Sequence, residues 1–217
     1  MTKDMLEKYF FIKDVVINEG FEHEILWQNN LNFQDVSESD FLREISWVIL
    51  SSGMRATVIE KHFPGISECF FNWESAEIIC KNSPICIKKA LRIFNNKKKI
   101  QAIVAAAEKI CTLGFCDIKD KILGNTLETL QSFMYIGPIT AYHLAKNIGF
   151  PVAKPDCHLV RIAQQAGYDN VQTFCKDVSD LSGDSVPVVD IVFWRYATIE
   201  PAYLNVLKKI HFNNCSL

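Results

Sequence analysis

Apolar residues recur at helical spacing along almost the whole of this 217-residue chain. The segment 41–49 shows the pattern most clearly, because its apolar side chains would share one face of a helix. They are Phe41, Leu42, Ile45, Val48 and Ile49. Ser37 or Ser39 precedes them, and serine is a favourable N-terminal cap. This periodicity points to a fold of packed helices.

The same spacing predicts further helices. They cover residues 55–62, 74–80, 84–94, 97–112, 125–133, 138–148, 157–166, 171–178, about 186–196, and a last helix from Pro201 or Ala202. We expect Pro64-Gly65 to end the helix at 55–62, Ser83-Pro84 to begin the helix at 84–94, and Gly114 to end the helix at 97–112. Residues 21–34 could instead hold a short strand or hairpin. The prediction is an all-α protein of about ten helices.

Composition and charge narrow the class of protein. With 49% apolar and 22% charged residues, the chain is typical of a folded globular protein. Its N-terminus has scattered charges and no secretory signal, and its apolar runs are shorter than the roughly 20 residues of a membrane span, so we expect a cytoplasmic protein. A net charge of −2 argues against a protein that coats nucleic acid through a broad basic face. One basic cluster, within 88–99, is equally consistent with a solvated face and with a phosphate contact.

Eight cysteines require a choice among disulfides, a metal site and buried thiols. They are Cys69, Cys80, Cys86, Cys111, Cys116, Cys157, Cys175 and Cys215. No two form a C-x-x-C pair, so zinc is not predicted. We expect small buried residues in a reducing compartment.

A glycine-proline turn between two predicted helices carries most of the functional information. Backbone amides at such a turn and helix N-terminus can hold a phosphate, and here they would belong to Tyr135, Gly137 and Thr140. Asp156 follows downstream of this turn. It directly precedes a predicted helix, where aspartate is also an ordinary N-terminal cap.

The turn and the acid together resemble a known signature. The pattern Ile136-Gly137-Pro138-x-Thr140-Ala141, followed by Lys154-Pro155-Asp156-x-His158, resembles that of the helix-hairpin-helix DNA glycosylase superfamily, which includes endonuclease III. The resemblance implies a two-lobed helical fold with a DNA-binding cleft between the lobes. One lobe would comprise about 40–145, with the hairpin at about 130–145. The other would comprise 1–39 plus 146–217.

The resemblance also implies roles for individual residues. Asp156 would be catalytic, activating water or stabilising an oxocarbenium-like sugar. DNA would be bound by Tyr135, Gly137, Pro138, Thr140, Lys154 and His158, although a histidine at this place can equally be solvated or locally bonded. Backbone carbonyls of Gln131, Phe133 and Ile136 would hold a monovalent cation, K⁺ or Na⁺.

Three departures from the family pattern refine the expectation. Ile139 stands where strand-nicking members carry a nucleophilic lysine, which predicts a monofunctional enzyme. Tyr135 replaces the first glycine of the hairpin, so its backbone needs an allowed φ. Only Cys215 lies where some members bind an iron–sulfur cluster with four cysteines, so no cluster is expected.

Base extrusion requires a residue that fills the gap in the duplex and a platform for the extruded base. Family members carry a glutamine for the gap where this chain has Gly53, so Met54 or Arg55 is the candidate wedge. Trp47 and Trp27 are candidate platforms, although most aromatic residues pack in cores. Asp190, within an apolar helix, is expected to be a cap or a buried salt-bridge partner.

The leading hypothesis is a monomeric, monofunctional DNA N-glycosylase of base-excision repair that acts on double-stranded DNA. The alternatives are a non-catalytic helix-hairpin-helix DNA-binding protein, a glycosylase with lyase activity from a displaced lysine such as Lys146 or Lys154, and a helical protein–protein adaptor. Alkylated purines, oxidised guanine and mismatched bases all remain candidate targets.

Overall fold

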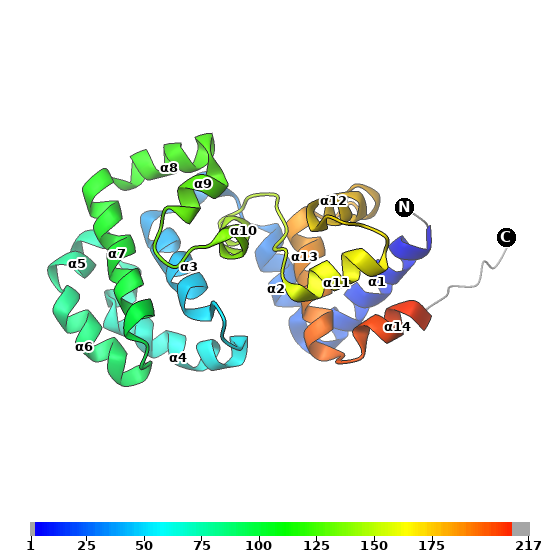
Figure 1. The fold of residues 1–217 in the computed structure, drawn as a ribbon, viewed down its shortest axis with the longest axis horizontal. Coiled ribbons are helices and arrows are strands. Elements are labelled where there is room, and N and C mark those ends of the chain that lie inside the picture. The colour runs from blue at the N-terminus through cyan, green and yellow to red at the C-terminus, as the bar shows by residue number, and fades with distance from the viewer. Residues whose placement is uncertain (1–2, 210–217) are drawn as a thin grey trace. The chain divides into compact units, whose positions relative to one another are not determined.

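The computed structural model describes residues 3–209, and every regular element among them is helical (Figure 1). These residues form two compact units. Unit 1 combines the residues up to Leu31 with those from Gly149 onward, and unit 2 is Asn32–Ile148. The sequence predicted the two boundaries at 39/40 and 145/146. Within residues 3–209, no helix has both the length and the apolarity to cross a membrane.

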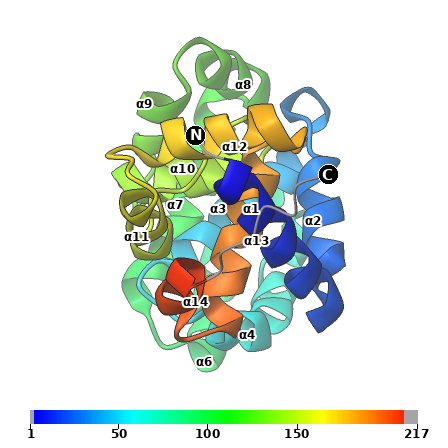
Figure 2. The same cartoon turned by 90° about the vertical axis from the view of Figure 1, so that its right-hand side faces the viewer.

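Unit 1 is built around one apolar helix. Its elements are α1 (Lys3–Val16), η1 (Ile17–Phe21), α2 (Glu22–Asn29), α11 (Cys157–Gln165), α12 (Val171–Ser182), α13 (Val186–Ile199) and α14 (Tyr203–Lys209). Helix α13 packs against α1, α2, α11 and α12 (Figure 2). Most of its residues are buried, as expected of a helix that is apolar on nearly every side.

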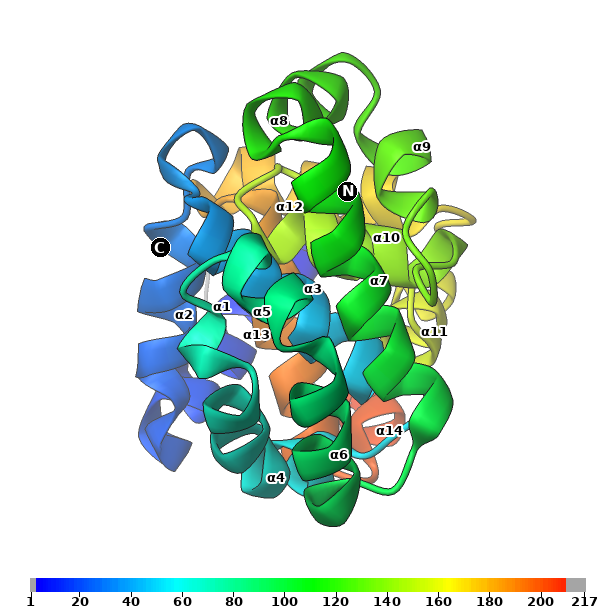
Figure 3. The same cartoon turned by 90° about the vertical axis from the view of Figure 1, so that its left-hand side faces the viewer.

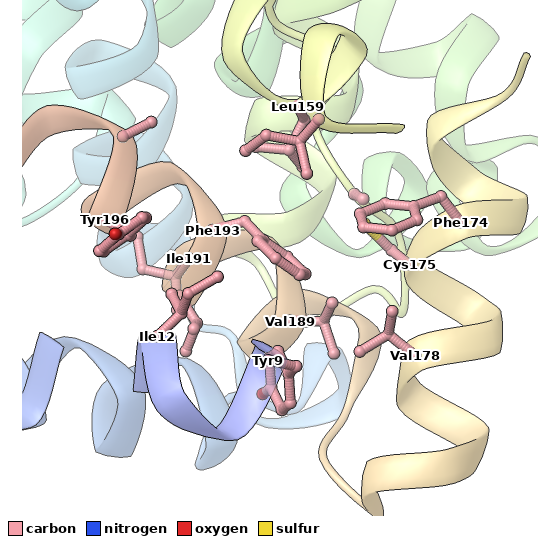
Figure 4. Packing of buried hydrophobic residues seen from close by; sticks show 14 of the residues in the cluster. Tyr9, Ile12, Leu159, Phe174, Cys175, Val178, Val189, Ile191, Phe193 and Tyr196 are labelled. Carbon is pink, nitrogen blue, oxygen red and sulfur yellow. The ribbon is translucent and has the colours of Figure 1, made fainter. Parts of the chain in front are cut away.

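Aromatic rings join the helices of unit 1 (Figure 4). The ring of Phe193 on α13 lies 5.6 Å from that of Tyr9 on α1 and 5.2 Å from that of Phe174 on α12. The Tyr9 hydroxyl donates a 2.6 Å hydrogen bond to Asp184, which also pairs with Lys13. Burial raises the pKa of Tyr9 well above its ordinary value, so this phenol keeps its proton as a donor.

Unit 2 has two central helices, α3 and α7, that pack against each other (Figure 3). Its elements are η2 (Phe33–Asp35), α3 (Glu38–Ser51), α4 (Ala56–Cys69), η3 (Phe71–Trp73), α5 (Ala76–Lys81), α6 (Ser83–Ile93), α7 (Lys97–Leu113), α8 (Phe115–Gly124), α9 (Thr126–Gln131) and α10 (Pro138–Asn147). Ser37 caps α3 through the amide of Asp40, as predicted. Gly114 follows α7 with φ of 81°, which also confirms the predicted stop.

Two predictions about local structure were wrong. Residues 21–34 form α2 and η2, with no strand. Arg195 explains the difference, because its guanidinium binds Glu24 in the first turn of α2 and lies 4.2 Å from the centre of the Phe21 ring. Helix α4 also continues through Pro64. Phe63, Ile66 and Cys69 are buried on one side of it, and this burial outweighs the backbone hydrogen bond that proline removes.

Two smaller differences concern the start of α6 and the presence of α8. Asn82, one residue before Ser83, precedes α6, so Ser83 lies inside the helix. Helix α8 was not predicted; Ile118 and Ile122, four residues apart, are its buried positions.

Candidate functional site

The predicted hairpin is present in unit 2 as α9, a turn at 132–137, and α10; these residues are called the hairpin below. Phe133 and Ile136 are buried, and their side chains anchor the turn in the interior of unit 2. The amide of Ile136 donates a 3.1 Å hydrogen bond to the carbonyl of Phe133, which closes the turn. Pro138 then begins α10, a position where its missing N–H costs no helical hydrogen bond.

Thr140 bonds back to the start of α10. Its Oγ1 accepts a 2.7 Å hydrogen bond from the amide of Gly137 and lies 3.1 Å from the Gly137 carbonyl. The Gly137 amide, which we expected to bind phosphate, is therefore engaged within the hairpin. Helix geometry leaves the amides of Ile139 and Thr140 without intrahelical acceptors, so these two groups are better placed to bind an anion.

The surface of the hairpin is apolar around these amides. Met134 and Ile139 are each about half exposed, and Tyr135 is also exposed. Tyr135 has φ of 72°, a left-handed conformation that glycine adopts at no steric cost. The backbone at this position is thus one that suits glycine, although a tyrosine occupies it. Gly137, in contrast, has an ordinary φ of −93°, and a Cβ there would meet only Thr140 Oγ1, at 4.0 Å.

A lysine of α7 supports the hairpin from the side. Lys109 Nζ donates to the carbonyl oxygen of Ser132 at 2.9 Å and to its hydroxyl at 2.6 Å, and it lies 4.4 Å from the centre of the Phe133 ring. Burial lowers the pKa of Lys109. Lys109 thus donates its hydrogen bonds beside the turn where carbonyls of Gln131, Phe133 and Ile136 were predicted to hold a cation. The Phe133 oxygen accepts one hydrogen bond and keeps a second lone pair, and the cation site on the three carbonyls stays a prediction.

Asp156 lies in unit 1, where it caps α11. Its Oδ1 accepts hydrogen bonds from the amides of His158 at 2.9 Å and Leu159 at 3.1 Å. No hydrogen bond reaches Oδ2 from any residue among 3–209. The carboxyl is half-buried and oriented by the helix end, while one of its oxygens stays available to a ligand.

The loop that leads to Asp156, residues 150–156, is called the acid loop below. Both backbone groups of Ala153 bond to the side-chain amide of Gln172 on α12, at 2.9 and 2.5 Å. The amide of Lys154 donates a 2.6 Å hydrogen bond to Asp190 on α13, a residue only 1% exposed. Two helices of unit 1 thus hold the acid loop through backbone contacts.

His158 is locally bonded in unit 1. Its Nδ1 lies 3.2 Å from the hydroxyl of Tyr203, and the two rings meet edge to face with centres 5.5 Å apart. This contact with α14 agrees with the expectation that His158 could be bonded within the protein. Its phosphate contact, and that of the half-buried Lys154, stay predictions.

The candidate wedge is the connection between α3 and α4, residues Ser52 to Arg55, called the 52–55 turn below. Gly53 has φ of 67°, which suits glycine, and Met54 and Arg55 are exposed. Trp47, on α3 in unit 2, packs edge to face on Phe63 and is half-buried. Trp27, on α2 in unit 1, is exposed.

The predicted site residues thus fall into two sets. The hairpin, the 52–55 turn and Trp47 belong to unit 2, whereas Asp156, Lys154, His158 and Trp27 belong to unit 1. Sequence reasoning missed Lys109 and Gln172, whose partners are backbone groups far away in the chain. It also assigned Lys99 to the exposed basic cluster, although Lys99 is buried; the other basic residues of that cluster are exposed.

The cysteines differ from the expectation of buried thiols. Cys69, Cys86 and Cys175 are buried, but Cys111, Cys116 and Cys157 are exposed; Cys215 lies outside the described residues. Cys80 and Cys111 approach to 3.2 Å between their sulfur atoms. Within residues 3–209, no three histidine, cysteine or acidic side chains come together as a metal site would require.

Two solved structures are similar to this chain. One is the 8-oxoguanine DNA glycosylase of Thermotoga maritima, with a TM-score of 0.62, 18% sequence identity, and coverage of 88% of this chain and 95% of that one. The other is the Methanocaldococcus jannaschii 8-oxoguanine glycosylase/lyase in complex with DNA containing 8-oxoguanine, with a TM-score of 0.58, 18% identity, and coverage of 88% and 98%. No protein-family model and no curated protein matches the chain. The likeness establishes the fold and confirms the predicted all-α class.

Proposed function

We propose that this chain is a monofunctional DNA N-glycosylase of base-excision repair that removes a damaged or mispaired base from double-stranded DNA. The observation that carries the proposal is the hydrogen bonding of the two carboxylate oxygens of Asp156. One carboxylate oxygen is fixed by two amides of α11, and the other accepts no hydrogen bond within residues 3–209. A residue that served only as a cap would not require the rest of the helix-hairpin-helix pattern or a fold shared with two glycosylases.

The proposed reaction is hydrolysis at C1′ of the sugar. The bond between C1′ and the base nitrogen breaks, and its electron pair leaves with the base, which takes a proton from solvent. Positive charge develops on the sugar, and the carboxylate of Asp156 stabilises it. Water forms the new bond to C1′ and gives its proton to the free oxygen of Asp156. The acid loop supports this role, because its contacts with Gln172 and Asp190 restrict where the carboxylate can lie.

Ile139 supports water as the nucleophile. Its hydrocarbon side chain is half exposed at the start of α10 and has no amine that could attack C1′. The alternative, an enzyme with lyase activity, would need a displaced lysine. Lys146 is a poor candidate because it is only 4% exposed, which leaves Lys154 as the residue to examine.

The hairpin is proposed to bind the DNA backbone. The amides of Ile139 and Thr140 would meet one phosphate, with Tyr135, Gly137 and Pro138 packed beside it. A monovalent cation on the carbonyls of Gln131, Phe133 and Ile136 would add positive charge there. The negative net charge is compatible with this mode, because amides and a helix terminus supply local positive potential. We propose that the protein acts as a monomer.

Oxidised guanine is the first lesion to examine, because both similar structures are of proteins that act on 8-oxoguanine. The excision assay uses duplexes carrying 8-oxoguanine, an alkylated purine or a mismatch, each analysed with and without alkali. A monofunctional enzyme leaves an intact abasic strand that alkali then cleaves. Strand cleavage without alkali, together with borohydride trapping that disappears in Lys154→Ala, would show a lyase instead.

Asp156→Asn separates catalysis from capping. Asparagine caps helices as well as aspartate does, so the variant should keep its stability. It cannot accept a proton from water, so excision should fall by about 100-fold or more while DNA binding persists. Asp180→Asn on α12 is the matched control, because that carboxylate is exposed and pairs with the exposed Lys176. Unchanged excision in Asp156→Asn would leave Asp156 as a cap, and no excision of any lesion by the wild type would favour the non-catalytic alternative.

A further inference from the structure

Lys99 is a buried lysine at the start of α7. Its side chain is 4% exposed although its neighbours Lys97 and Lys98 point into solvent. A buried ammonium loses its hydration, and it is retained in proteins when it gains strong partners. The partners of Lys99 therefore indicate why it is there.

Those partners are backbone oxygens at the end of another helix. Lys99 Nζ donates to the carbonyl of Leu50 at 2.6 Å and to that of Ser52 at 2.5 Å. Leu50 lies in the last turn of α3, and Ser52 is the residue after the helix. The carbonyls of Val48 and Ser51 accept the amides of Ser52 and Met54. Lys99 thus binds two carbonyls that the turn itself leaves without a donor.

The electrostatics of the two helices explain the direction of this contact. Lys99 occupies the first turn of α7, whose positive helix end disfavours a cation. The negative end of α3 attracts it. Burial lowers the pKa of Lys99, which shows the cost of removing the ammonium from water. Lys99 therefore stabilises the end of α3 and the residues after it, while its charge is unfavourable at the start of α7.

The residues after α3 are the 52–55 turn. Four residues connect α3 to α4, and Gly53 is left-handed. Met54 is 39% exposed, and Arg55 beside it is also exposed. An apolar side chain on a short, anchored turn costs little backbone entropy to place in a stack of bases, because the backbone that carries it is already fixed.

We propose that Lys99 is a positioning residue that holds the 52–55 turn so that Met54 fills the gap left in the duplex by an extruded base. The inference rests on the proposed glycosylase function and adds to it the residue that fixes the wedge. Lys99 itself touches no DNA. Its loss would release the carbonyls of Leu50 and Ser52, and Met54 would no longer be presented in one place.

The experiment compares paired and unpaired lesions. A wedge is needed to displace a paired base, but a lesion in a single-nucleotide bulge has no opposite base, so its extrusion costs less and leaves no unpaired partner to hold apart. Lys99→Met should reduce excision from the duplex about tenfold or more, because charge-assisted bonds are lost, and should leave excision from the bulge within about twofold. Met54→Ala should show the same selectivity. Lys99→Arg, which keeps the donors, should restore part of the duplex rate, and Lys81→Met removes an exposed lysine as the control.

Equal losses on both substrates in Lys99→Met and Met54→Ala would overturn the proposal. Met54→Ala changes an exposed side chain, so its result holds even if Lys99→Met folds poorly. If the wild type excises no lesion, the proposed function fails, and hydrogen exchange then tests the positioning role alone. Faster exchange at the amides of Gly53 and Met54 in Lys99→Met than in Lys81→Met would support it, and equal exchange would refute it.

Discussion

The backbone amide of Lys154 donates its hydrogen bond to the buried carboxylate of Asp190, two residues before the acid that caps α11. Asp190 was expected to be a cap or a salt-bridge partner. The contact with the Lys154 amide holds a loop, which gives a reason for a carboxylate within the apolar helix α13, and the salt-bridge role stays a prediction.

Two replacements of Asp190 should show how much of its effect on stability comes from accepting the hydrogen bond and how much from its charge. Asp190→Leu leaves the Lys154 amide without this acceptor, and we expect the free energy of unfolding to fall by about 1–3 kcal/mol. Asp190→Asn keeps an oxygen at this position and should cost less. Urea unfolding of both variants measures the difference, and excision should follow the same order. A leucine variant more stable than the wild type would mean that burying the charge costs more than the loop contact contributes.

Tyr135 should be a source of strain. Its φ of 72° costs an L-amino acid about 1–2 kcal/mol, and glycine avoids this cost while losing some entropy on folding. Tyr135→Gly should therefore raise the free energy of unfolding by about 0.5–1 kcal/mol. Met134→Gly, at an exposed neighbour without a positive φ, should lower it. Destabilisation by both changes, measured by thermal unfolding, would show that packing of the tyrosine side chain outweighs the strain.

Cys80 and Cys111 should form a disulfide on mild oxidation. Their sulfur atoms are 3.2 Å apart, and Cys111 is exposed on α7. Burial and the contact with Cys111 raise the pKa of Cys80 to about 12, so Cys111 should react first. An azo oxidant such as diamide takes the two thiol hydrogens and becomes a hydrazine as the S–S bond forms.

The product should lose the mass of two hydrogen atoms and gain up to about 3 kcal/mol of stability, because the bond closes a loop in the unfolded chain. Mass spectrometry and thermal unfolding, with and without reductant, measure both effects. Cys80→Ser should abolish them, and Cys116→Ser should not. Persistence of the mass change in Cys80→Ser would assign it to other cysteines.

Glu44 should make stability depend on pH. Burial raises its pKa from 4.5, although Arg43 and Asn147 bind the two carboxylate oxygens and oppose the shift. The folded state therefore holds this proton more tightly than the unfolded state. The contribution of Glu44 to the free energy of unfolding is largest below the ordinary glutamate pKa, and it declines as pH rises through the raised pKa of the folded state.

Glu44→Gln removes this titration and keeps an oxygen for Asn147. Relative to the variant, the wild type should lose free energy of unfolding as pH rises from the ordinary glutamate pKa through the raised folded value. Urea unfolding across that range measures the difference. A difference that stays constant with pH would show that Arg43 and Asn147 fully offset the burial.

Local signals in the sequence were sufficient for much of the fold. Helix α7 was predicted to within a residue of its end, because Gly114 stops it whatever packs around it. Helix α4 was predicted to end too early, because Pro64 is a local signal and the burial of Ile66 beyond it is not. Helix α2 was missed for the same reason, since Arg195 lies 171 residues from its partner Glu24.

The candidate site divides in the same way. The hairpin and Asp156 could be identified because their residue types and spacing form a pattern. Lys99, Lys109 and Gln172 could not, because they bind backbone groups 49, 23 and 19 residues away, and a carbonyl or amide has no signature in a sequence. The supporting contacts of a site are visible only after folding.

Helix α7 also sets an interval between the two loops that we propose to contact DNA. Lys99 near its start holds the 52–55 turn, and Lys109, ten positions later, holds the hairpin. The rise of an α-helix places these residues about 15 Å apart along its axis, close to the length of four nucleotides of B-DNA. The regular rise of the helix thus sets the spacing between the two lysines, and inserting one residue between them would lengthen it by about 1.5 Å and rotate one lysine relative to the other by about 100°.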